Sequence, residues 1–199
     1  FADLLGGLDS VYLFTKYLFP ISTDAERNYQ KSLLAERDVK KMKQYFYTFW
    51  AQRNNYDPQA EWENYHHRIK EVNSLYASAL RPGYMTDRGR VSLVYGKPNL
   101  REERRFESGL PPYEIWRYDQ LSSRYLDVVN QTNKIFVFGE LNISSREYEL
   151  IHSNAMGELN DRRWRQTLSG GAVSSDNLDD NGNTNMDEWG SRINSNILL

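Results

Sequence analysis

The sequence predicts an α+β fold, and two observations lead to this prediction. In the first half of the chain, apolar residues recur at steps of three and four, as on one face of a helix. After about residue 88 the pattern changes to alternation and short apolar runs, which are typical of strands. Because the helical patterns precede the strand patterns, we expect two or three helices packed with a small, mainly antiparallel sheet of about four strands.

The composition limits the kinds of protein to consider. The chain has 199 residues, with 25 basic and 27 acidic side chains, a formal charge of −2 and no cysteine. This length suits one domain with attached segments, and we divide it into residues 1–22, 23–168 and 169–199. The charge balance argues against a nucleic-acid binder, and no apolar run reaches the roughly 18–20 residues that span a bilayer. Without cysteine, disulfides and thiolate metal sites are excluded.

Residues 1–22 form an apolar and aromatic arm, bracketed by Gly6-Gly7 and Pro20. The spacing of its apolar residues fits a short helix and an extended segment equally well. The arm packs either on the core of this domain, which we favour, or on a partner protein. In the second case the side chains expected to contact the partner are Leu13, Phe14 and Phe19.

Residues 23–80 are predicted to be helical. Thr23 and Glu26 have the spacing of a capping box, which satisfies two backbone amides at a helix start. Asp57-Pro58 indicates a second start, with an N-cap followed by proline. Two apolar stripes at helical spacing follow these starts or lie between them, and Pro82-Gly83 closes the second. The stripes are Val39, Met42, Phe46, Phe49 and Trp50, and then Trp62, Tyr65, Ile69, Val72, Tyr76 and Ala79.

Four segments between residues 88 and 152 have the character of strands. Residues 113–118 alternate with period two, and residues 135–138 form a short apolar run. We also expect strands at residues 91–95 and 148–152. Spacings of about 20 residues without a strong helix between them favour antiparallel pairing.

The segment from Gly83 to Pro98 carries a family resemblance. The sequences Gly-Tyr-Met-Thr-Asp-Arg-Gly-Arg at 83–90 and Tyr-Gly-Lys-Pro at 95–98 are similar to the motif of the GWxTD (Gly-Trp-x-Thr-Asp) domain family, with Tyr84 in place of the tryptophan. The resemblance extends over roughly residues 17–168. It implies a bacterial protein, exported or associated with the cell envelope, and it carries no established catalytic activity. The motif residues are Gly83, Tyr84, Thr86, Asp87, Arg88, Gly89, Arg90, Tyr95, Gly96 and Pro98.

The motif has two interpretations. In the functional one, its polar side chains form a recognition site on the loop that enters the first strand. In the structural one, which we favour, Gly83 ends a helix in a left-handed conformation and Thr86 or Asp87 accepts hydrogen bonds from nearby backbone amides. Gly96 and Pro98 then end the strand. Turn chemistry alone explains these residue types.

Other candidate sites have weaker support. The histidines, His66, His67 and His152, lack the spacing of a zinc site and are expected to be structural. Two basic clusters are diluted by acidic residues, so we expect solvated faces or salt links between proteins rather than nucleic-acid contacts. They are Arg101, Arg104 and Arg105, and then Arg162, Arg163 and Arg165. Arg163, Trp164 and Arg165 are the second expected partner contact.

The polar tail at residues 169–199 contains a pattern similar to a calcium loop. Asn177, Asp179, Asn181 and Glu188 fall at positions 1, 3, 5 and 12 of such a loop. However, Asn at position 1 removes a charge, and no helical pattern precedes the loop. Linkers rich in Asn, Asp and Gly produce such matches by chance, so we expect neither calcium nor another cofactor.

Together these features predict a non-catalytic domain that binds other proteins. The family resemblance adds the expectation of a larger envelope assembly, in the periplasm or at the outer membrane. Membrane association would then come only through partners or through an anchor preceding Phe1. The alternative is a ligand-binding or enzymatic domain that uses a loop pocket near Asp87, Arg88, Arg90 and His152.

Overall fold

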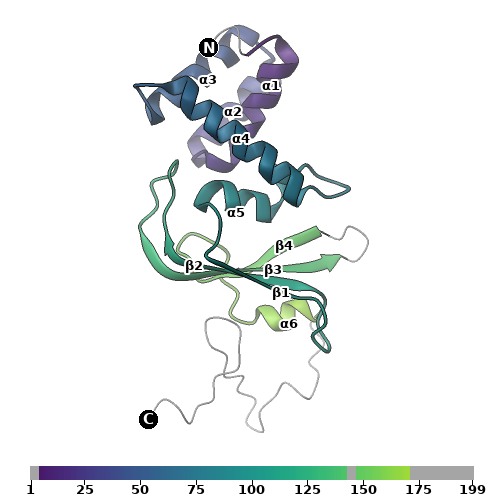
Figure 1. Cartoon of the computed structure of the whole chain (residues 1–199). Coiled ribbons are helices and arrows are strands. Elements are labelled where there is room, and N and C mark those ends of the chain that lie inside the picture. Colours follow the sequence, from purple (N-terminus) through teal and green to yellow (C-terminus); the bar gives the residue numbers. More distant parts are fainter. Residues whose placement is uncertain (1–4, 143–146, 171–199) are drawn as a thin grey trace.

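The computed structural model describes residues 5–142 and 147–170, and it confirms the α+β class. Helices α1 to α4 form one layer, and a four-stranded antiparallel sheet forms the other (Figure 1). Helix α5 lies between the helical layer and the sheet, and α6 covers the opposite face of the sheet. No helix in these two described ranges is both long enough and apolar enough to cross a membrane.

The predicted N-terminal arm packs on the core of its own domain. It forms helix α1 (Leu8–Tyr17) and the short 3-10 helix η1 (Phe19–Ile21). Val11, Leu18 and Ile21 are fully buried there. Of the two arrangements expected from the sequence, packing on this domain is therefore the one observed.

Helices α2 (Asp24–Glu36) and α4 (Pro58–Tyr76) begin where the sequence predicts, and α3 (Val39–Arg53) begins at the first residue of the first predicted stripe. The capping box is confirmed, because Thr23 Oγ1 accepts from the Glu26 amide and the Glu26 carboxylate accepts from the Thr23 amide. Asp57 caps α4 through the Ala60 amide, at 2.9 Å. Most of the two predicted stripes are buried side chains of α3 and α4: Met42, Phe46, Phe49 and Trp50, and then Trp62, Tyr65, Ile69, Val72 and Tyr76. Val39 is only partly buried, and the second stripe stops before Ala79, because α4 ends at Tyr76 rather than at Pro82-Gly83.

The strand predicted at residues 91–95 is wrong, because this segment is the second half of helix α5 (Asp87–Tyr95). Thr86 caps the helix by accepting a hydrogen bond from the Gly89 amide at 3.1 Å. Gly83 does not end a helix in a left-handed conformation either, since it begins the 3-10 helix η2 (Gly83–Met85). The left-handed glycine is Gly96, with φ of 87°, and it ends α5 rather than a strand.

The sheet has the strand order β1-β2-β3-β4 with antiparallel pairing throughout. Three predicted segments are confirmed as strands, and the remaining strand is β1, which the sequence analysis missed. The strands are β1 (Leu100–Arg104), β2 (Tyr113–Leu121), β3 (Gln131–Asn142) and β4 (Glu147–Ser153).

The sheet buries both of its faces. Trp116, Tyr118, Phe136 and Phe138 belong to the main core that the helical layer shares. The alternate side chains Tyr113, Ile115, Ile135 and Val137 form a second core with Ile151, and with Trp164 and Leu168 of α6 (Trp164–Leu168).

Candidate functional site

The family motif forms a close junction between α4, η2 and α5. A Cβ atom on Gly83 would lie 2.2 Å from the carbonyl oxygen of Val72 in α4. A Cβ atom on Gly89 would lie 1.8 Å from the carbonyl oxygen of Gly83. Both glycines are therefore required by the close approach of backbones, not by a positive φ. Tyr84 is buried beside them, and its ring packs edge-on against Tyr17 at 4.8 Å between centroids.

Two charged side chains of the motif connect α5 to the sheet. The Asp87 carboxylate accepts a hydrogen bond of 2.7 Å from the Leu150 amide of β4. The Arg88 guanidinium donates to the Glu114 carboxylate of β2 at 2.7 Å. Glu114 is only 1% exposed, and it also accepts from Arg101 and from the Trp116 indole. These contacts satisfy buried charges, so they hold the layers together.

The third charged side chain, Arg90, makes a bidentate ion pair with Glu158 in the loop after β4, at 2.9 and 2.6 Å. Tyr95 donates its hydroxyl to the same carboxylate at 2.8 Å. Burial alone would lower the pKa of Arg90, but Glu158 holds it above its usual value. Burial, with the charge of Glu158, raises the pKa of Tyr95. Both donors therefore keep their protons at any physiological pH.

The loop pocket expected near Asp87, Arg88, Arg90 and His152 does not form as one site. Asp87 and Arg90 line the same hollow, whereas Arg88 points to Glu114 and His152 lies buried in β4. Burial lowers the pKa of His152, and the charge of Asp161 partly opposes this shift. His152 is thus a neutral, buried side chain at neutral pH rather than part of a shared pocket.

Two adjoining hollows lie between η1 and α2 on one side and α5 on the other, the larger one reaching the loops after β2 and β4, and we call them together the seam groove. The smaller one, of about 240 Å³, is lined by Phe19, Pro20, Arg27, Tyr84, Met85, Asp87 and Arg90. The larger one, of about 630 Å³, is lined by Pro20, Ser22, Thr23, Asp24, Arg27, Arg90, Val94, Tyr95, Leu126, Asp127, Val128, Met156, Gly157 and Glu158. The two hollows share three lining residues, Pro20, Arg27 and Arg90.

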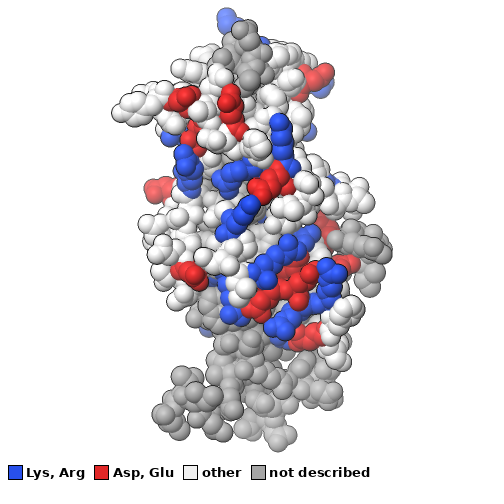
Figure 2. All heavy atoms as spheres, in the orientation of Figure 1, with Lys and Arg blue, Asp and Glu red and all other residues white. Residues whose placement is uncertain are grey.

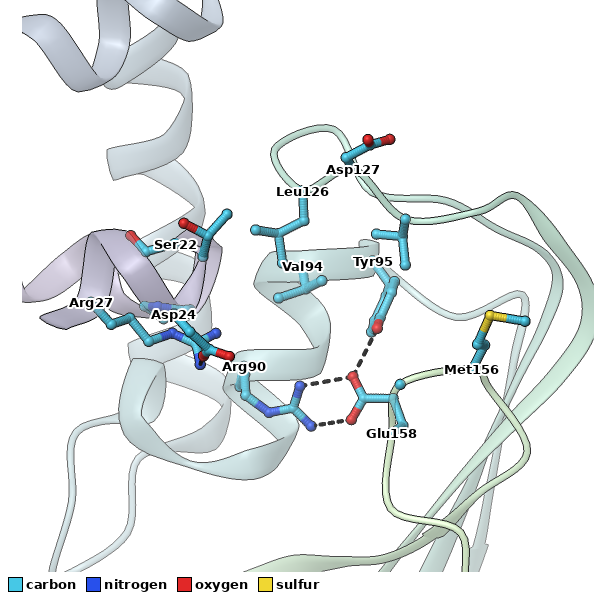
Figure 3. A pocket seen from close by; sticks show the side chains of 14 residues that line it. Ser22, Asp24, Arg27, Arg90, Val94, Tyr95, Leu126, Asp127, Met156 and Glu158 are labelled. Atoms are coloured by element: carbon cyan, nitrogen blue, oxygen red, sulfur yellow. Dashed lines mark hydrogen bonds and ion pairs between the residues drawn. The ribbon is translucent and has the colours of Figure 1, made fainter.

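Figure 3 shows how the side chains of the larger hollow face one another. Arg27 and Asp24 extend from α2 on one side, and Met156 and Glu158 lie on the other. Arg90 extends from α5 between them, with its guanidinium on Glu158. The groove therefore offers apolar surface and both signs of charge, which suits recognition of a polar and apolar ligand.

The structure places the remaining candidates outside this groove. His66 stacks on Trp62 at 4.7 Å between ring centroids, and His67 is exposed on the same helix. Across residues 5–142 and 147–170 there is no group of three His, Asp or Glu side chains that could hold a metal ion. The calcium pattern at Asn177, Asp179, Asn181 and Glu188 lies outside the described residues.

The first basic cluster belongs to the edge of the sheet. Arg101 pairs with Glu114, Arg104 with Glu102, and Arg105 with Glu103, at 2.7, 3.0 and 2.8 Å. Figure 2 shows basic and acidic side chains gathered side by side over this part of the molecule. This is the solvated, mutually paired face expected from the diluted charge.

The expected partner contacts differ in their exposure. Trp164 is 3% exposed against the sheet, and Arg165 pairs with Glu107, while Arg163 is exposed. Phe14 packs on Trp62, at 4.9 Å between ring centroids. Phe19 is partly buried against the small core cluster of Val11, Leu33, Leu34 and Met42. Leu13 is 41% exposed. Of these six side chains only Trp164 is buried, Leu13 and Arg163 are exposed, and contact with a partner stays a prediction.

The sequence analysis did not find Arg27, Asp24, Asp127 or Met156, which line the seam groove. They come from α2, the β2–β3 loop and the loop after β4, separated by tens of residues. No local motif joins them, so only the fold brings them together.

Comparison with known proteins gives one match. The family model described as GWxTD domain matches residues 9–167, which is most of the chain. No curated protein and no solved structure gives a significant match.

Proposed function

The chain belongs to the GWxTD domain family, and from this we propose that it is a non-catalytic domain that binds other proteins within a bacterial envelope assembly. Its partners are then other envelope proteins, and its place is the periplasm or the periplasmic side of the outer membrane. This location follows from the exported character expected for the family.

One observation carries the proposal: the charged residues of the family motif bind to other parts of their own domain. The Asp87 carboxylate accepts a hydrogen bond from the Leu150 amide. Arg88 forms an ion pair with Glu114, and Arg90 forms one with Glu158. A reaction centre needs polar groups aimed at a substrate position, whereas these are aimed at the neighbouring layer. The motif therefore makes the domain rigid. A rigid surface favours binding, because less conformational entropy is lost when a partner associates.

The proposal is tested by copurification from the native bacterial envelope. The full chain, carrying an affinity tag, is crosslinked in place, gently solubilised and purified, and crosslinked peptides are identified by mass spectrometry. A second exported protein with the same tag serves as the control. We expect partner proteins in fixed ratio to the chain, with crosslinks to its surface residues. Recovery of the chain alone, as a monomer near 23.4 kDa, would refute the assembly role and favour a ligand-binding domain.

A further inference from the structure

The two ends of the seam groove differ in the polarity and charge of the residues that line them. Its smaller end is mainly apolar, with Phe19, Pro20, Tyr84 and Met85, and Met85 is 50% exposed. Asp87 also lines this end, and its carboxylate accepts a hydrogen bond from the Leu150 amide. Its larger end contains the exposed carboxylates of Asp24 and Asp127. Arg27 and Arg90 line both ends, so cationic groups lie between the apolar and acidic parts.

The two arginines differ in their capacity to bind a ligand. Both Nη atoms of Arg90 are bound by Glu158, whose side chain is only 8% exposed. Arg27 donates Nε to the Phe19 carbonyl oxygen at 3.1 Å, which holds its guanidinium in place. Its only ion pair within residues 5–142 and 147–170 is with Asp24 at 3.2 Å. The Asp24 side chain is 95% exposed, and such a surface pair is weak, so an incoming carboxylate can replace it.

The size of the apolar end indicates the kind of occupant. At about 240 Å³, the apolar end is smaller than the roughly 300–1,000 Å³ typical of sites that enclose a small molecule, whereas the larger hollow, at about 630 Å³, lies within that range. The smaller hollow accommodates a single apolar side chain, and the larger hollow beside it has room for the residues that follow in the same segment. Arginine binds a carboxylate through two parallel N–H donors. An acidic residue next to the apolar one would therefore be held in a fixed orientation.

We propose that the seam groove docks an extended segment of a partner protein, with an apolar side chain beside Met85 and an acidic side chain on Arg27. A basic side chain further along the segment then lies near Asp24 and Asp127. This assignment rests on the proposed protein-binding function and names the class of segment that is bound. Complementary charges in this order also set the direction in which the segment lies.

A random peptide display library, selected on the full chain, tests the assignment. We expect enriched peptides to contain an apolar residue followed closely by Asp or Glu. Affinities of a labelled enriched peptide are then measured by fluorescence anisotropy. Arg27→Glu should weaken binding by about tenfold or more, since it replaces attraction with repulsion. The control Lys31→Glu makes the same charge change one turn further along α2, outside the groove, and should leave the affinity unchanged.

A double-mutant cycle identifies the contact itself. Replacing the acidic residue of the peptide by its amide should weaken binding to the natural chain but not to Arg27→Gln, because the two changes remove the same interaction. Met85→Asp provides an independent variant at the apolar end. Circular dichroism establishes that each variant is folded before its affinity is compared.

Several results would overturn the assignment. These are the absence of enriched peptides, enriched peptides without the apolar and acidic pair, or equal affinity for Arg27→Glu and the natural chain. Dimerisation of the natural chain that Arg27→Glu abolishes would assign the groove to a second copy, and saturation by hexanoate alone would assign it to small carboxylates. If Arg27→Glu retains all partners in the envelope copurification, the protein-binding function stands and the groove is the wrong surface. If the natural chain copurifies with no partner, the protein-binding function itself fails.

Discussion

Gly89→Ala is expected to destabilise the fold, although alanine normally stabilises a helix. The added Cβ would lie 1.8 Å from the Gly83 carbonyl oxygen and 2.9 Å from a methyl carbon of Val72. The nearer contact involves backbone, so relief requires η2 and α5 to separate. Overpacking costs about 1–3 kcal/mol, and a rigid obstacle places this site at the upper end. The helix propensity gain of about 1 kcal/mol offsets part of that cost, which leaves a net loss of about 2 kcal/mol.

Urea denaturation followed by far-ultraviolet circular dichroism measures this loss. For a chain of this size, about 2 kcal/mol also corresponds to a melting temperature lower by roughly 4–8 °C. Gly7→Ala is the control, because a Cβ there meets no atom within 4 Å. Gly7 is the N-cap residue of α1, so its replacement should cost less than about 1 kcal/mol. A Gly89→Ala variant as stable as the natural chain would refute the close approach of η2 and α5.

Three further changes test the Asp87 hydrogen bond, the buried His152 and the second core. Asp87→Ala removes a charge-assisted hydrogen bond to the Leu150 amide and should cost about 1.5–3 kcal/mol, with faster hydrogen exchange at that amide. The pKa of His152 is lowered by burial, so its contribution to stability is complete above its ordinary value of about 6.5 and is lost as pH falls through the native pKa. His152→Gln should therefore flatten the fall in melting temperature between about pH 7 and pH 5. Trp164→Ala should cost about 3–5 kcal/mol by opening the second core, whereas Leu13→Ala at the surface should stay within about 0.5 kcal/mol.

The helices with one apolar face could be predicted closely from the sequence. Helix α4 contacts the core with one stripe only, so its apolar residues keep helical spacing and its start has a recognisable cap. Helix α5 lacks this pattern, because it lies between two layers (Figure 1) and buries Val91, Leu93 and Val94, whose spacing does not keep to one helical face. A helix buried on several sides has a continuous apolar run, which cannot be distinguished by periodicity from a buried strand.

Strand β1 escaped prediction for the opposite reason. It is an edge strand, paired only with β2, and four of its five residues are charged. Charged edge strands are common because they prevent unwanted pairing with other chains, but they lack the alternation that indicates a half-buried strand. The pairing of Arg101 with the buried Glu114 becomes visible only when both strands are in place.

The seam groove could not be predicted, since its residues are related only by the fold. Arg27 lies on the first turn of α2, where the capping box of Thr23 and Glu26 already explains the local sequence. Its partner in the groove wall, Arg90, belongs to α5, and Met156 follows β4. Each residue has an ordinary local explanation, and the hollow arises only when the helical layer is placed on the sheet.

The position of α5 between two layers explains why its motif combines glycine with charged residues. On the side of the helical layer, backbone must approach backbone, and only glycine at 83 and 89 leaves enough room. On the side of the sheet, the Glu114 carboxylate of β2 and the Leu150 amide of β4 need hydrogen-bond partners, which side chains of α5 supply. Asp87 and Arg88 reach these groups with charged side chains, and each contact is a charge-assisted hydrogen bond that is partly buried. A helix with two unlike interfaces thus needs small residues for one and long charged residues for the other, within a single turn of each other.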